Sequence, residues 1–174
     1  MGGFGSGWQR SKRTTVEDCL PLTLSQMLQQ NALTPGKRSA GSWSWYRHGE
    51  EERYAFIGYD ADLSDFEDAW LRLDYRVNGL PVRDLISLTT SEPNFGGARW
   101  WFVCPVMEER GERHRTTRLY LPPQHQRFGS RKSYGLTYTS CQESGQWNGF
   151  YRRLAADAGC DVPTVRAQLK NLWR

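Results

Sequence analysis

The chain has 174 residues, enough for one compact domain or two small ones, and its net charge is only +4. Aromatic residues make up 13% of the chain, which excludes an intrinsically disordered protein because enough apolar surface is present to fill a core. No run of about eighteen apolar residues occurs, and the N-terminus lacks the apolar core of a signal peptide, so we expect a cytoplasmic protein without a membrane partner.

Residues 1–20 have the composition of a basic, glycine-rich arm. The segment GGFGSGW is not a Walker loop, because no G-K-[ST] closes it and no strand precedes it. A basic cluster of Arg10, Lys12 and Arg13 follows and predicts contact with phosphate groups. The alternative is a tail without a binding role.

Residues 21–97 predict a short helix followed by a small antiparallel sheet. The segment LTLSQMLQQNALTPG has helical periodicity, with Thr23 or Ser25 as the cap. Trp43 and Trp45 alternate with serines, as in a strand, and Asn78-Gly79 predicts a hairpin turn. We interpret the tryptophans as core, with a base-stacking platform as the alternative. The acidic stretch DADLSDFEDAW lacks the spacing of a calcium loop, so we interpret it as a solvated loop.

Residues 98–140 predict the skeleton of a zinc ribbon, in which two tight turns each supply two metal ligands. The turns would be residues 104–107 and 130–133, which have the two-residue spacing of a C-x-x-C knuckle. Cys104 supplies a thiolate, but Met107, Ser130 and Ser133 at the other positions are poor zinc ligands, so we expect neither a metal nor a cofactor. Packing would hold this degenerate module together instead, through Trp100, Phe102, Leu119, Leu121, Phe128, Tyr134 and Tyr138.

Basic residues flank the second of these turns. They are Arg127, Arg131 and Lys132, and further arginines lie on the first turn and the returning strand. Ribbon tips of this kind commonly meet nucleic acid, with arginine and lysine on the phosphates. The alternative is a basic loop that only adds solubility.

Residues 141–174 predict a helical hairpin with the spacing of a helix-turn-helix. Ala155 would let two helices approach, Gly159 would make the turn, and Val165 would pack inward. Asp161 is placed to cap the second helix. If the unit reads DNA, its outward residues would enter the major groove; these are Thr164, Arg166, Lys170 and Asn171. Any other helical hairpin would show the same pattern.

Several motifs resemble an uncharacterised bacterial family found in mobile-element and phage settings. They are the G-G-x-G-S-G start, Thr14 to Cys19, Phe95 to Pro105, Leu119 to Pro123, and Tyr134 to Tyr138. In typical members the two turns are C-P-x-C and C-x-x-C, so the resemblance implies a zinc ribbon fused to a small sheet. This chain departs from that pattern at three of the four ligand positions. The family implies no activity.

Charge is segregated along the chain. Residues 1–48 carry six Lys/Arg against two acids, residues 49–97 carry four against eleven, residues 98–135 carry eight against three, and residues 136–174 carry five against three. Such segregation favours a charged partner, with nucleic acid first, unless folding mixes these charges on one surface.

No set of residues indicates catalysis. The three histidines, His48, His114 and His125, lie in polar contexts without a known catalytic motif, so we expect a protein that is not an enzyme. The four cysteines are scattered without a C-x-x-C pair, so we expect them to be reduced and mostly buried.

The sequence therefore predicts an α+β chain with a small, mostly antiparallel sheet, a degenerate zinc-ribbon-like module and a C-terminal helical pair. The leading hypothesis is a nucleic-acid-binding protein, with DNA favoured. The alternative is an inhibitor or adaptor that docks on a host nucleoprotein machine such as a CRISPR effector. The family setting and the acidic segment 50–68 favour that alternative.

Overall fold

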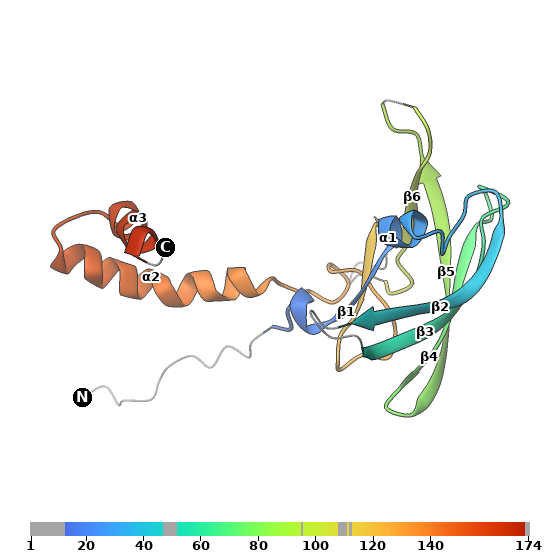
Figure 1. The fold of residues 1–174 in the computed structure, drawn as a ribbon, viewed down its shortest axis with the longest axis horizontal. Coiled ribbons are helices and arrows are strands. Elements are labelled where there is room, and N and C mark those ends of the chain that lie inside the picture. Colours follow the sequence, from blue (N-terminus) through green and yellow to red (C-terminus); the bar gives the residue numbers. More distant parts are fainter. Residues whose placement is uncertain (1–12, 47–51, 95, 108–110, 112, 173–174) are drawn as a thin grey trace. The chain divides into compact units, whose positions relative to one another are not determined.

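The computed structural model describes residues 13–46, 52–94, 96–107, 111 and 113–172 (Figure 1). The chain divides into two compact units. One comprises residues 16–136, and the other comprises residues 1–15 together with residues 137–174. Among the described residues, the first unit contains all the strands and the second contains the two long helices.

A six-stranded antiparallel sheet dominates the first unit (Figure 1). Each strand pairs with the next one along the chain, in the order β2-β3-β4-β5-β6-β7. Asn78 and Gly79 join β4 to β5 with φ values of 52° and 81°, which confirms the predicted hairpin turn. The strands are β2 (Arg38–Tyr46), β3 (Arg53–Asp62), β4 (Trp70–Val77), β5 (Leu80–Ser91), β6 (Arg99–Val103) and β7 (Arg115–Thr116).

Smaller elements pack against the inner face of this sheet. β1 (Leu20–Thr23) pairs with β8 (Arg118–Leu121) in a separate two-stranded sheet, next to η1 (Val16–Asp18) and α1 (Leu24–Gln29). The apolar side chains of β1, α1 and β8 join one core with those of the large sheet, whereas Val16 of η1 packs against a smaller cluster of Cys19, Tyr120 and Leu136. The Trp45 indole fixes the two sheets together, because its Nε1 donates to the Pro21 carbonyl oxygen at 2.7 Å.

The core follows the period of two that strands impose on side chains. Trp43 and Trp45 are 9% and 8% exposed, which confirms their interpretation as core residues. Most other inward positions of the large sheet are also buried: Ile57, Ala61, Leu71, Leu73, Tyr75, Asp84, Ile86, Leu88, Trp100 and Phe102. These features confirm the predicted α+β class and the mostly antiparallel sheet.

The second unit contains α2 (Thr139–Asp157) and α3 (Val162–Leu172). Ala155 and Val165 are buried, Gly159 has a φ of +61°, and the Thr164 N–H donates to Asp161 Oδ1 at 3.1 Å. The predicted hairpin, its turn and its cap are therefore confirmed. No helix in the described part of the chain is both long and apolar enough to cross a membrane.

Three local predictions were wrong. Tyr138 was expected in the ribbon core but is 42% exposed, because it stands at the cap position of α2 in the other unit. The cysteines were expected to be mostly buried, but Cys141 is exposed in the first turn of α2 and Cys160 is only half-buried. Thr23 takes the cap position of α1, as one of the two predicted alternatives, but the expected side-chain capping bond is absent, since the side chain is buried at the end of β1.

Candidate nucleic-acid interface

The two turns of the ribbon-like module meet in a hydrogen-bonded cluster. Cys104 Sγ accepts from the Ser130 N–H at 3.2 Å, and it lies 3.2 Å from Ser133 Oγ. Ser130 Oγ lies 3.0 Å from Ser133 Oγ and accepts from the Ser133 N–H at 3.0 Å. The structure therefore brings together three of the four predicted ligand positions, which we call the Cys-Ser-Ser cluster.

The cluster satisfies its own hydrogen-bonding groups without an ion. The Cys104 thiol and the Ser133 hydroxyl each lie 3.1 Å from the Val106 carbonyl oxygen, which has two lone pairs to accept their protons. The Ser130 hydroxyl can then donate to Ser133 Oγ. Each such bond contributes about 1 kcal/mol net. The cluster thus sets the register of the two turns.

Met107 does not join the cluster and is 56% exposed. A neutral thioether and two hydroxyls also lack the negative charge that holds Zn²⁺. Across the described residues, no group of three or more His, Cys, Asp or Glu side chains is arranged to hold a metal ion.

Close packing holds the second turn against the core. Phe128 is fully buried, stacking with Trp45 at a centroid distance of 6.3 Å and edge-on with Tyr75 at 5.4 Å. Gly129 follows, and a Cβ there would lie 2.5 Å from the Tyr134 ring. The turn can take this path only because residue 129 has no side chain.

A shallow basic groove runs beside the paired turns, with a volume of about 660 Å³. Arg113, His125 and Arg127 supply its charged and titratable groups, and none of the described residues that line it is acidic. Three glutamates of the same segment, Glu108, Glu109 and Glu112, lie outside the described residues. The other lining residues are Pro105, Val106, Met107, Gln126, Ser133 and Tyr134.

An aromatic pair forms part of the groove wall. The His125 and Tyr134 rings lie 4.2 Å apart, and the Tyr134 hydroxyl donates to the Arg127 carbonyl oxygen at 2.7 Å. Burial raises the pKa of Tyr134 to about 12, so its phenol stays neutral and adds no negative charge to the groove.

Arg127 has a structural role that the sequence did not predict. Its Nε and Nη2 atoms lie 2.7 and 2.5 Å from Asp84 Oδ1, and Asp84 is only 1% exposed. The Tyr75 hydroxyl lies 3.2 Å from Asp84 Oδ2 and 2.9 Å from the Gln126 carbonyl oxygen. Burial and the Asp84 charge raise the pKa of Tyr75, and the hydrogen bond to Asp84 raises that of Arg127. The guanidinium thus neutralises Asp84 while its 53% exposed side chain borders the groove.

The other predicted contacts lie in several places. Arg131 and Lys132 are exposed on the second turn, and Arg131 Nη1 donates to the Leu136 carbonyl oxygen at 3.4 Å. Arg13 and Thr164 are exposed in the second unit. The remaining predicted residues are not described in full: Arg10 and Lys12 lie outside the described residues, and so do the side chains of Arg166 and Lys170 on α3.

A second basic site was predicted only in part, since Arg115 belongs to the arginines expected on the returning strand but its position beside Arg99 and Trp101 was not predicted. Arg99 and Arg115 lie over the Trp101 ring, at 4.4 and 5.8 Å from its centroid. Within the described part of the chain, neither guanidinium pairs with an acid. The sequence pattern of β6 could have indicated this site. The period of two that buries Trp100 and Phe102 turns Trp101 to the opposite face of the sheet.

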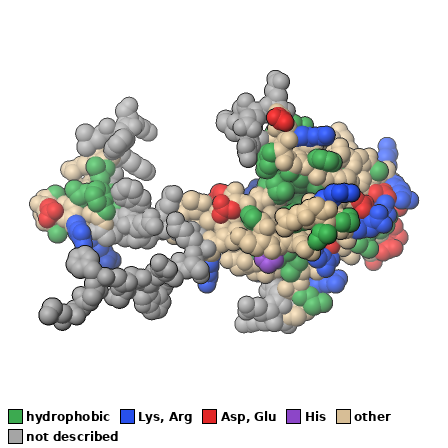
Figure 2. Space-filling view, turned by 90° about the horizontal axis from the view of Figure 1, so that it is seen from below, with side chains coloured by type: hydrophobic (Ala, Val, Ile, Leu, Met, Phe, Trp, Pro, Cys, Tyr) green, Lys and Arg blue, Asp and Glu red, His purple; other side chains and the backbone are tan. Residues whose placement is uncertain are grey.

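Elsewhere on the outer face of the sheet, folding mixes opposite charges. Asp60 pairs with Arg38 and Arg72, and Asp74 pairs with Arg72 and Arg83. Arg38 belongs to the basic segment 1–48, and Asp60 belongs to the acidic segment 49–97. Their ion pair shows that opposite charges separated along the sequence lie together here in the fold. Figure 2 shows basic and acidic side chains gathered together at the sheet.

Comparison with protein-family models, curated proteins and solved structures finds no match to this chain.

Proposed function

We propose that this chain is a non-enzymatic nucleic-acid-binding protein, with DNA as the favoured ligand, that belongs to a mobile element or phage. The single observation that carries the proposal is the basic groove beside the paired turns. Its lining contains the Arg113 guanidinium, the His125 imidazole and the Arg127 guanidinium, whose charge the buried Asp84 neutralises. Arg131 and Lys132 extend the positive surface along the second turn. Guanidinium and ammonium groups on a fixed scaffold are the main contacts that proteins make to phosphates.

The shape of this surface favours backbone contact over sequence reading. The basic groove is shallow, and its cationic side chains border it. They are not carried on a helix or a two-stranded ribbon that could enter the major groove of DNA. The His125–Tyr134 pair offers a ring face on which an exposed base can stack. Limited sequence specificity follows, unless Thr164, Arg166 and Lys170 on α3 read base edges.

The test measures binding to labelled duplex and single-stranded DNA over a salt series. If Arg113, Arg131 and Lys132 all contact duplex phosphates, the slope of log K against log salt is about −2.7, because each contact contributes about −0.9. Arg127 is not counted, because its charge neutralises Asp84. Lys132→Glu should reduce the magnitude of that slope by about one unit. Lys37→Glu is the matched control, since Lys37 is also an exposed lysine outside the strands and immediately precedes β2 rather than bordering the basic groove. Equal effects of the two substitutions, or no binding at low salt, would refute the proposal.

The second candidate function is docking on a host nucleoprotein machine as an inhibitor or adaptor. An exposed acidic loop favours it: Asp65, Glu67 and Asp68 are all exposed, and Phe66 beside them is 48% exposed. This loop has the charge of a nucleic-acid backbone and could meet a basic protein surface. The double variant Arg131→Glu/Lys132→Glu separates the candidates, because it should abolish DNA binding but leave docking through the acidic loop intact.

A further inference from the structure

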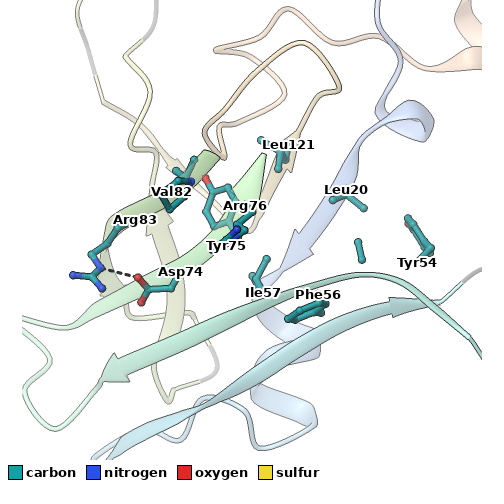
Figure 3. A pocket seen from close by; sticks show the side chains of 12 residues that line it. Leu20, Tyr54, Phe56, Ile57, Asp74, Tyr75, Arg76, Val82, Arg83 and Leu121 are labelled. Carbon is teal, nitrogen blue, oxygen red and sulfur yellow. Dashed lines mark hydrogen bonds and ion pairs between the residues drawn. The ribbon is translucent and has the colours of Figure 1, made fainter. Parts of the chain in front are cut away.

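The large sheet splits along its middle. β3 and β4 pair from Asp62↔Trp70 only as far as Gly58↔Asp74. Beyond that pair, residues 53–57 of β3 remain paired with β2 alone, and Tyr75–Val77 of β4 remain paired with β5 alone. Figure 3 shows the two strands diverging, with Phe56 and Ile57 on one side and Tyr75 and Arg76 on the other.

The space between the diverging strands is a groove of about 840 Å³, which we call the split-sheet groove. Its walls are the β3 residues Tyr54–Ile57 and the β4 residues Asp74–Arg76, with Pro81–Arg83 of β5 behind β4. Leu20 of β1 and Leu121 of β8 also line it. The volume lies within the range of about 300–1,000 Å³ that is usual for ligand sites.

Both walls of the groove are strand edges. The edge of a β-strand presents backbone N–H and C=O groups in the spacing that another strand requires. Residues Ala55–Ile57 and Tyr75–Arg76 lie just beyond the last β3–β4 pair and line the groove from opposite sides. An extended segment placed between them would find a strand on each side, so the site is suited to an inserted strand.

The side chains of the groove alternate in the way that would select such a strand. Ile57 and Tyr75 are 3% and 8% exposed and belong to the core face, whereas Phe56 is 59% exposed on the opposite face. Apolar residues on one face of an inserted strand would therefore meet Ile57 together with Leu20 and Leu121. Polar residues on the other face of the inserted strand would lie beside Phe56 and stay in contact with water.

Charge fixes a further feature of the occupant. Asp74 is bonded to Arg83, whose Nε lies 2.6 Å from Asp74 Oδ1 (Figure 3). Arg76 is exposed, and no acid among the described residues pairs with it. The described lining of the groove therefore has one uncompensated positive charge, which an acidic side chain on the occupant would neutralise.

We propose that the split-sheet groove binds an extended peptide segment of a partner protein, which adds a strand between β3 and β4. Its residues alternate between apolar and polar, and an acidic residue lies opposite Arg76. Main-chain hydrogen bonds supply affinity in this mode of recognition, and the alternate side chains supply specificity. The site is separate from the basic groove at the paired turns and does not depend on nucleic-acid binding.

A random eight-residue peptide library displayed on phage tests the proposal. Selection on the full chain should enrich alternating apolar sequences that contain an acidic residue. Synthetic copies of the enriched peptides should bind Ala55→Phe at least tenfold more weakly, because the new ring fills the groove. Ala40→Phe is the matched control, since Ala40 is exposed on β2, away from the groove, and this variant should bind as the unaltered chain does.

Hydrogen exchange gives a readout that does not depend on how well Ala55→Phe folds. The enriched peptide should slow amide exchange at Ala55–Ile57 and at Tyr75–Val77. The proposal is overturned if no peptide is enriched, if the peptides bind Ala55→Phe equally well, or if these amides are not protected. A concentration-dependent dimer that Ala55→Phe abolishes would instead identify a second copy of the chain as the occupant and would equally overturn it.

Discussion

Replacing Arg127 by methionine should expose how far the second turn depends on one ion pair. The guanidinium contacts Asp84 through both Nε and Nη2, and Asp84 is 1% exposed. Methionine keeps the length and apolar stem of the side chain but removes both contacts. The Asp84 carboxylate then remains in the core, where the Tyr75 hydroxyl still donates to its Oδ2.

The expected cost is about 3 kcal/mol of unfolding free energy. Removing one partner of a buried ion pair costs about 3–5 kcal/mol, because the other charge stays desolvated. The lower end applies here, since the Arg127 side chain is 53% exposed and water already screens part of the interaction. For a unit of this size the loss corresponds to a fall in Tm of roughly 10–15 °C.

A double-mutant cycle measured by urea unfolding tests this reasoning. Asp84→Asn removes the buried charge, so Arg127→Met should cost at least about 1.5 kcal/mol less in that background than in the unaltered chain. Arg113→Met is the control, because Arg113 is exposed and should contribute less than about 0.5 kcal/mol. Additive effects of the two substitutions, or an Arg127→Met variant as stable as Arg113→Met, would show that the ion pair does not hold the turn.

Three further substitutions probe the second turn, the residue between η1 and β1, and the helical hairpin. Gly129→Ala should cost about 1–3 kcal/mol in urea unfolding, because its Cβ would lie 2.5 Å from the Tyr134 ring, whereas Gly58→Ala places its Cβ at an ordinary 3.5 Å contact and should cost less. Burial, with nearby Asp18 and Glu17, raises the pKa of Cys19 from 9.0 to about 11, so its contribution to stability is present below pH 9 and is lost between pH 9 and pH 11. Cys19→Ala should flatten the stability profile in that window, and an unchanged profile would contradict this assignment. Asp161→Ala should cost about 1 kcal/mol and lower the helix content of the hairpin, as measured by circular dichroism. An unchanged helix content would contradict the capping role of Asp161.

The sequence predicted the elements whose signals are local. Asn78-Gly79 specifies its turn through the positive φ that both residues tolerate, and Asp161 specifies its cap through a bond three residues along the chain. Alternation placed Trp43 and Trp45 in the core for the same reason, since the period of two is a property of each strand alone. These features could be predicted because they depend on few residues.

Features that join distant segments were missed. β1 pairs with β8 across nearly one hundred residues, and its sequence LPLT carries too short a pattern to predict a strand. The contact between Asp84 and Arg127 spans 43 positions. Asp84 alternates with the buried Ile86 and Leu88, but alternation within one strand cannot identify the cation that neutralises a buried carboxylate.

The Cys-Ser-Ser cluster shows why a ribbon-like turn pair can keep its register without zinc. A structural zinc ion supplies roughly 10–16 kcal/mol, whereas the cluster's hydrogen bonds supply about 1 kcal/mol each. The difference has to come from burial, and Phe102, Leu119 and Phe128 are fully buried beside the turns at about 1.5–3 kcal/mol each. The turns are therefore anchored to the core of the sheet, and their position depends on that core rather than on an ion. The two grooves proposed as binding surfaces, the basic groove and the split-sheet groove, share the core but no described lining residue. For this reason a substitution that fills one of them should leave binding at the other intact, and their functions can be tested separately.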